Sequence, residues 1–186
     1  MQWMIKMVGV VVTLAALTGC SVVQVSQDYD PRADLSGQGT WQWRQPDQAT
    51  VGDVRIDNPL LDGRIRRAVE SHLAGRKMRQ PTHMPDLYIS YHLSIEQRIE
   101  GNTVYPTFGA WWYGYPWFGG MEAETRIHQY DECRLVIDIH AAETGHLLWR
   151  GTGVYRYKTY PNPQAAAESI RKTVDKILLQ FPPHPS

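Results

Sequence analysis

The sequence predicts an α+β fold with two layers, in which two amphipathic helices cover one face of a mostly antiparallel, possibly mixed, sheet of about five strands. Three observations support this prediction. Several segments alternate apolar and polar residues, two segments repeat apolar residues at helical spacing, and Glu143-Thr144-Gly145 separates two of the alternating segments. One-sided alternation is typical of a sheet with one buried face, and amphipathic helices need such a face to cover.

The strands are expected where the alternation is found. Residues 21–39 begin with a short β-prone stretch, and residues 40–43 alternate again. The clearest strand is 87–95, in which every second residue is apolar. Two further strands are expected at 134–140 and 147–157, and the turn residues between them predict a hairpin.

Both helices are expected to begin at the same signal, an asparagine followed by a proline, at Asn58-Pro59 and Asn162-Pro163. Asparagine caps the free amides of a first turn, and proline fits the first helical position. Gly75 should end the first helix, and Pro182-Pro183 should end the second. The apolar faces are Leu61, Ile65, Ala68, Val69 and Leu73 in the first helix, and Ile170, Val174, Ile177, Leu178 and Phe181 in the second.

The first twenty residues have the features of a lipoprotein signal peptide. Lys6 precedes an apolar run over residues 7–17 that is too short to cross a hydrocarbon core of about 30 Å. Leu17-Thr18-Gly19-Cys20 matches a lipobox, so we expect cleavage before Cys20 and attachment of a diacylglyceryl thioether and an N-acyl group to Cys20. Together these chains hold a protein on its membrane. A plain secretory signal with an incidental cysteine is the alternative.

These features predict one domain and a tether. Residues 1–19 are the signal peptide, 20–39 carry the lipid, the tether and the first strand, and 40–186 complete a single α+β domain. The chain resembles lipoproteins that are sorted by the residue after the cysteine, where aspartate implies retention in the inner membrane. Ser21 stands there instead, which implies the periplasmic face of the outer membrane.

Composition excludes some classes of partner. The 19 basic and 19 acidic residues balance, so the chain has no basic excess for phosphates and nucleic acid is not expected to bind. His-Glu-x-x-His and Cys-x-x-Cys spacings do not occur, so we expect no metal and no cofactor. Cys133 is expected to be a buried thiol in or beside a strand, with intermolecular pairing as the alternative.

Short motifs in a fixed order run through nearly all of the mature chain. They are Asp28-Tyr29-Asp30-Pro31 with Ala33-Asp34, Trp41-Gln42-Trp43, Asn58-Pro59-Leu60-Leu61-Asp62 with Arg64-Ile65, Pro85-Asp86-Leu87 with Tyr91-His92, Leu135-Val136-Ile137-Asp138, Thr144-Gly145, Leu148-Trp149-Arg150-Gly151 and Phe181-Pro182-Pro183. In these motifs the chain resembles the bacterial lipoprotein family catalogued as domain of unknown function 4136, although it departs from the usual pattern in its central loop. The resemblance implies an envelope lipoprotein without an assigned activity, and it supplies no catalytic residues.

One group of polar residues invites a catalytic or metal-binding interpretation. Asp138 and His140 lie two residues apart, so they share the polar face of an expected strand, and His92 occupies a polar position in another. A hydrolase or metal-dependent enzyme using these three residues is the alternative hypothesis. The chain has no Gly-x-Ser-x-Gly elbow, and polar pairs are common on the solvated side of a sheet. We therefore expect no catalytic residues.

The most unusual segment is an uncharged aromatic run, Tyr105–Gly120, inside a Gly/Pro-rich loop expected at about 101–122. Its candidate binding residues are Tyr105, Phe108, Trp111, Trp112, Tyr113, Tyr115, Trp117 and Phe118.

Three interpretations of this aromatic run remain open. The rings could pack as a satellite core, contact an envelope protein or a lipid interface, or stack on envelope glycans. The leading hypothesis is a non-enzymatic envelope lipoprotein that binds or scaffolds another envelope component.

Overall fold

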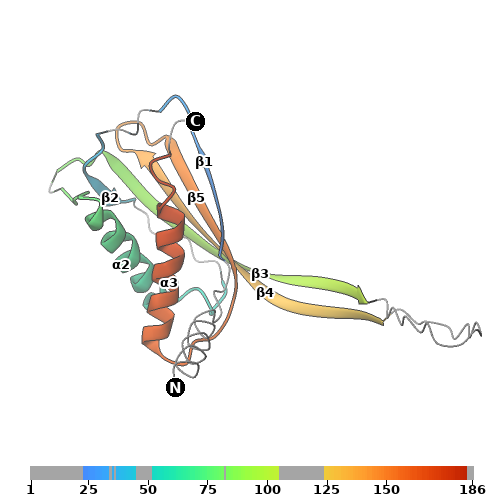
Figure 1. The fold of residues 1–186 in the computed structure, drawn as a ribbon. Coiled ribbons are helices and arrows are strands. Elements are labelled where there is room, and N and C mark those ends of the chain that lie inside the picture. The colour runs from blue at the N-terminus through green and yellow to red at the C-terminus, as the bar shows by residue number, and fades with distance from the viewer. Residues whose placement is uncertain are drawn as a thin grey trace, which may run out of the picture.

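The structure is a computed structural model that describes residues 23–33, 35, 37–44, 52–81, 83–104 and 124–183, without the side chains of 102–104 and 124–126. Within these ranges the chain forms five strands and two helices (Figure 1). In chain order they are β1 (Gln24–Tyr29), β2 (Trp41–Trp43), α2 (Pro59–Gly75), β3 (Leu87–Val104), β4 (Glu124–Ala141), β5 (Leu147–Arg156) and α3 (Pro163–Leu178).

The strands form one mixed sheet in the order β1-β5-β4-β3-β2. β2 pairs with β3 in parallel, whereas β1 with β5, β5 with β4, and β4 with β3 are antiparallel. Both helices lie on the same face of this sheet (Figure 1). The predicted α+β class, the two layers and the mostly antiparallel sheet with two helices on one face are confirmed.

The helices begin as their capping signals predict. The Oδ1 atom of Asn58 accepts a hydrogen bond from the Leu61 amide at 2.8 Å, and Oδ1 of Asn162 accepts one from the Ala165 amide at 2.8 Å. Each cap satisfies an amide that the first helical turn leaves without a partner. The proline after each asparagine occupies the start of its helix, so the same two-residue signal fixes where both helices begin.

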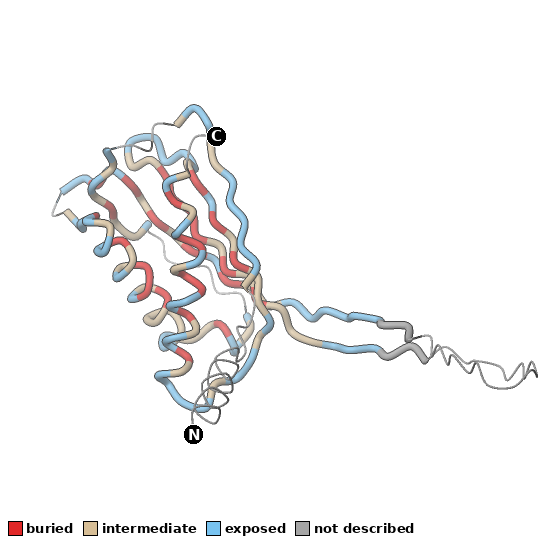
Figure 2. Tube along the Cα trace, viewed as in Figure 1, coloured by how far each residue is buried: buried red, intermediate tan, exposed pale blue. Residues whose placement is uncertain are grey.

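The core lies between the sheet and the helices, as the band of buried residues in Figure 2 shows. Trp149 of β5 is 0% exposed and Trp41 of β2 is 2% exposed. Close to Trp149, Gly151 and Gly153 allow α3 to approach the sheet, because a Cβ on either glycine would lie within 3 Å of the Ile177 side chain. The closest packing of the two layers is therefore at β5 and α3.

The structure differs from the sequence prediction in the length of the central hairpin. β3 continues to Val104 and β4 starts at Glu124, so the residues from 101 to 104, expected as loop, belong to a strand. Beyond the pair Ile95↔Cys133 the two strands run on together as a projection from the body (Figure 1). We call this projection, residues 96–104 with 124–132, the hairpin arm. Its polar residues gave no alternating apolar signal from which a strand could be predicted.

Cys133 is buried at the base of the hairpin arm, as predicted, and among the described residues it has no disulfide partner. Burial raises the pKa of this thiol to about 11, which keeps it protonated at neutral pH. In the described part of the chain, no helix has both the length and the hydrophobicity that a membrane crossing requires.

Candidate functional site

The polar face of the sheet carries Asp138 of β4, the first residue of the catalytic hypothesis. Its side chain is buried, and both carboxylate oxygens accept hydrogen bonds from Arg150 on β5, at 2.6 Å from Nε and 2.7 Å from Nη2. This hydrogen bonding raises the pKa of Arg150. A bidentate pair of this kind is strong and fixes the carboxylate in one orientation. Asp138 is therefore already occupied by a positive partner.

His140 occupies the next position on the same face, and it is buried as well. Nη1 of Arg44 lies 3.1 Å from each ring nitrogen, and Nδ1 lies 3.3 Å from the backbone oxygen of Gly145. Burial, followed by the charge of Arg44, lowers the pKa of His140. The imidazole is thus neutral at neutral pH. Its two contacts are Arg44, which directly follows β2, and Gly145 in the turn between β4 and β5.

His92 lies on the same face of β3, opposite Val136, and its side chain is exposed. Among the described side chains, no hydrogen bond joins any two of Asp138, His140 and His92. The described residues also contain no group of three or more histidine, cysteine or carboxylate side chains that could hold a metal ion. The structure places Asp138 and His140 on the same face of β4. Each of them, however, contacts residues other than the two remaining members of the catalytic hypothesis.

We expect the free energy of unfolding to decrease when the pH falls below the ordinary histidine pKa of about 6.5. Because the pKa of His140 is lower in the folded state, the unfolded chain binds this proton first. The stabilising contribution of neutral His140 is complete above the pKa that His140 has in the unfolded chain. It is lost as the pH falls towards the lower pKa of His140 in the folded protein. Urea unfolding at about pH 7.5 and about pH 5 measures this loss.

The matched variants for this measurement are His140→Gln and His92→Gln. His140→Gln should reduce the difference in unfolding free energy between the two pH values, since the buried titrating group is gone. His92→Gln is the control, because it makes the same substitution at an exposed histidine on the same sheet face. An unchanged pH dependence in His140→Gln would show that another group causes the loss.

The lipidation candidate Cys20 and all eight aromatic candidates, from Tyr105 to Phe118, lie outside the described residues. Their attachment points are described. Val104 and Glu124, the last described residues on either side of the aromatic run, pair with each other at the end of the hairpin arm. The arm extends nine register pairs beyond the base, from Glu96↔Glu132 to Val104↔Glu124, a length of about 30 Å at 3.3 Å per residue. The aromatic run therefore joins the body far from its core.

One face of the hairpin arm carries a network of polar side chains. Arg98 donates to Glu132 at 3.2 Å, and Glu100 accepts hydrogen bonds from the Tyr130 hydroxyl at 2.9 Å and from Arg156 at 3.0 Å. The Arg156 guanidinium also lies over the Tyr130 ring, 4.0 Å from its centroid. These groups are solvent-exposed or half-buried, so water screens their charges. The network therefore contributes little to the stability of the arm.

The other face of the hairpin arm has two exposed apolar side chains. Ile99 and Ile127 are each 69% exposed. They are diagonal neighbours, because Ile99 pairs with Gln129 and Gly101 pairs with Ile127. This face continues the one that the helices cover in the body. Sequence reasoning did not identify these residues, since each is a single isoleucine among polar neighbours.

An open groove of about 500 Å³ lies at the base of the hairpin arm, between the starts of the two helices. Its lining includes three cationic residues and both helix-capping asparagines, Arg55, Arg64, Lys158, Asn58 and Asn162. The charge of Arg55 is balanced by Asp53 at 2.6 Å and Asp131 at 2.7 Å. Arg64 and Lys158 leave the groove with a modest positive character.

Comparison with known proteins assigns the chain to a family. A sequence model described as "Domain of unknown function (DUF4136)" matches residues 25–183. The chain belongs to the DUF4136 family. The match begins in β1 and ends just after α3, so it covers the whole α+β body of the DUF4136 domain together with its hairpin arm. A comparison with curated proteins finds no significant relative.

Solved structures show where a related fold occurs. A PDZ domain protein from Parabacteroides distasonis superimposes with a TM-score of 0.53 at 14% identity, over 88% of this chain, and the chain spans only 36% of that protein. The PelC dodecamer from Paraburkholderia phytofirmans gives a TM-score of 0.46 at 12% identity, over 84% of this chain and 96% of that one. A minor lipoprotein from Acinetobacter baumannii gives 0.36 at 8% identity, over 76% and 86%. The first comparison shows a shared fold and nothing about activity, and the other two are too distant for any conclusion.

Proposed function

We propose that this DUF4136 protein is a non-enzymatic envelope lipoprotein, attached by lipid on Cys20, that uses its hairpin arm to bind or scaffold another envelope component. The observation that carries the proposal is the pairing of Val104 with Glu124 at the end of the arm. It attaches a run of eight candidate aromatic residues to the part of the described chain that lies farthest from the core. Aromatic residues are enriched where proteins bind partners.

The contacts on the polar sheet face support a structural role for the residues of the catalytic alternative. A hydrolase would need Asp138 or His140 to be available to a substrate or a nucleophile. Asp138 is instead paired bidentately with Arg150, and His140 is in contact with Arg44 and Gly145. The Asp138–Arg150 pair is a cross-strand contact of the kind that stabilises a half-solvated sheet.

The proposed location is the periplasmic face of the outer membrane. The lipobox ending at Cys20 supports anchoring by lipid, and Ser21 in place of an aspartate supports sorting to the outer membrane. Labelling of cells with radioactive palmitate, followed by membrane fractionation, tests both points. We expect a labelled band in the outer-membrane fraction that is lost in Cys20→Ser.

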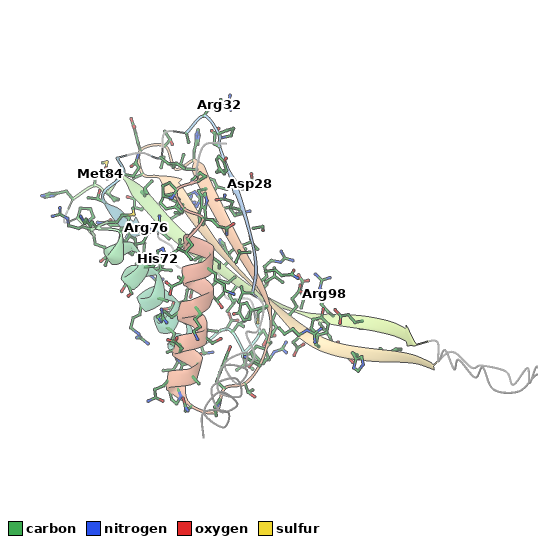
Figure 3. All side chains as sticks on the ribbon, viewed as in Figure 1. Asp28, Arg32, His72, Arg76, Met84 and Arg98 are labelled. Carbon is green, nitrogen blue, oxygen red and sulfur yellow. The ribbon has the colours of Figure 1, made fainter. Side chains whose placement is uncertain are left out.

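Photo-crosslinking in intact cells tests the binding role. Benzoylphenylalanine at 111, 112 or 117 of the full-length lipoprotein should capture a discrete protein, lipid or glycan, which mass spectrometry then identifies. The same group at Arg32, which is exposed at the end of the body opposite the arm (Figure 3), serves as the control. Purely intramolecular adducts at all three aromatic positions would contradict the proposal and make the run a satellite core.

Deletion of residues 105–120 should abolish co-purification of the component that the crosslinks identify, and it should leave the body folded. Because the chain enters and leaves the run at the arm tip, we expect the free energy of unfolding to change by no more than about 0.5 kcal/mol, as for a surface substitution. A length-matched variant with the eight aromatic residues replaced by serine should also lose co-purification of that component. Loss of cooperative unfolding in either variant would show that the rings belong to the core.

A further inference from the structure

The first strand starts at the end of the sheet from which the hairpin arm leaves. Gln24 pairs with Val154 of β5, Val154 pairs with Arg134 of β4, and Arg134 pairs with Ser94 of β3. Ser94 is two residues before the arm begins. In Figure 1 the start of β1 and the base of the arm lie together, and the β1–β2 connection lies at the opposite end of the sheet. The N-terminal tether and the arm therefore leave the body from the same end.

The tether between the lipid and this end is short. Cys20 precedes Gln24 by four residues, which span at most about 14 Å when fully extended at 3.6 Å per residue. A lipid on Cys20 therefore keeps the arm end of the body within about 14 Å of the bilayer. The arm is about 30 Å long, roughly twice this distance. A projection of that length is long enough to reach the membrane surface from the body.

The two faces of the hairpin arm differ in polarity around the pairs Ile99↔Gln129 and Gly101↔Ile127. Its polar face satisfies its charges through Arg98, Glu100 and Arg156, whereas the opposite face exposes Ile99 and Ile127 to solvent. Every described residue of β3 from Glu96 to Gly101 is exposed, as Figure 2 shows along the arm. A two-stranded ribbon without a covered apolar face is marginally stable in water. A further layer that covered the isoleucine face would therefore stabilise the arm.

We infer that the isoleucine face of the arm lies on the bilayer that carries the lipid of Cys20. The inference rests on the proposed lipid anchor, and it identifies the component that the arm binds as a lipid surface. Ile99 and Ile127 enter the boundary between headgroups and acyl chains, and the Arg98–Glu132 and Arg156–Glu100 network stays hydrated. Arg64 and Lys158 line the groove at the same end of the body, where they would face anionic headgroups.

Photo-crosslinking at single arm positions tests this inference. Benzoylphenylalanine replaces residue 99 or residue 127 of the full-length protein in intact cells, and mass spectrometry identifies the adducts. Residues 98 and 128 are matched controls, because successive strand residues point to opposite faces. We expect lipid adducts at 99 and 127 to exceed those at 98 and 128 several-fold. Equal yields on both faces, or adducts at 99 and 127 with protein alone, including a second copy of this chain, would overturn the inference.

Palmitate labelling in the same cells separates this test from the proposed function. If Cys20 is labelled and positions 99 and 127 give no excess of lipid adducts, the arm does not lie on the bilayer and the anchor stands. If Cys20 carries no lipid, the proposed lipoprotein function fails first, and the inference that depends on it fails as well. The variant Cys20→Ser should lose the lipid adducts at 99 and 127, since the anchor holds the arm at the surface.

Discussion

Replacing Trp149 with alanine is expected to lower the free energy of unfolding by about 4 kcal/mol, within the range for large aromatic residues in a core. Trp149 is 0% exposed and lies in the sheet layer against α3. Its ring packs edge-on against Phe181 at 5.4 Å, and its Nε1 donates to Oε1 of Gln27 at 2.9 Å. The substitution removes these contacts together and leaves a cavity. Urea unfolding followed by circular dichroism measures the loss.

Trp149→Phe is the matched control. It keeps an aromatic ring in the core but removes the hydrogen bond to Gln27 and part of the ring volume, so we expect a smaller loss of about 1.5 kcal/mol. A result in which both variants lose less than about 1 kcal/mol would contradict the assignment of Trp149 to the centre of the core.

The second large effect is expected from Gly151→Ala, a change of one methyl group. A Cβ at residue 151 would lie 2.2 Å from Cη2 of Trp149 and 2.5 Å from Cγ2 of Ile177. The ring of Trp149 is rigid and fully buried, and Cγ2 of Ile177 is bonded to the branched Cβ rather than placed at the flexible end of that side chain. We expect a loss of about 3 kcal/mol in unfolding free energy, at the upper end of the range for overpacked cores. Thermal and urea unfolding measure it.

Gly153→Ala provides the comparison for this prediction. Its Cβ would meet Cδ1 of Ile177 at 2.7 Å and no backbone atom among its nearest neighbours. The flexible end of the isoleucine can shift, so the expected loss is about 1 kcal/mol. A loss at Gly153 as large as that at Gly151 would show that α3 is held rigidly along its whole length, and that the ring of Trp149 is not the specific obstacle.

Local signals made the helices and the short strands predictable. The same asparagine-proline pair begins both helices because the cap and the fixed φ of proline act within one turn. The alternation of 87–95 predicted the body segment of β3, because helices cover only one face there. The family resemblance was confirmed over residues 25–183. For the helices the deciding interactions lie within one turn of the sequence, and for β3 the apolar residues repeat with a period of two.

The partner of Asp138 could not be predicted, because it depends on the pairing register of β4 and β5. A bulge between Ile139 and His140 shifts this register by one residue. Without the shift, Trp149 would be opposite Asp138 on the polar face, since a one-residue slip exchanges the two faces of a strand. The bulge therefore buries Trp149 and brings Arg150 to Asp138. Sequence periodicity alone does not locate such a bulge.

The hairpin arm was missed for a related reason. Its strands have no core to cover, so residues 96–104 and 124–132 lack the apolar alternation from which strands are predicted. The pairing of one strand with the other, rather than burial, defines them. The isoleucine face becomes visible only when Ile99 and Ile127, far apart in the sequence, are placed side by side by that pairing.

The antiparallel pairing of β1 with β5 determines how the body would bear mechanical load. A force applied through a lipid on Cys20 reaches the first residue of β1 and acts along the strand. The hydrogen bonds from Gln24↔Val154 to Tyr29↔Trp149 run across the strands, so such a pull shears them together instead of unzipping them one at a time. The hydrogen bond from Trp149 to Gln27 adds a side-chain link between β5 and β1. With the proposed lipid anchor on Cys20, β1 would transmit such a load from the membrane to the body.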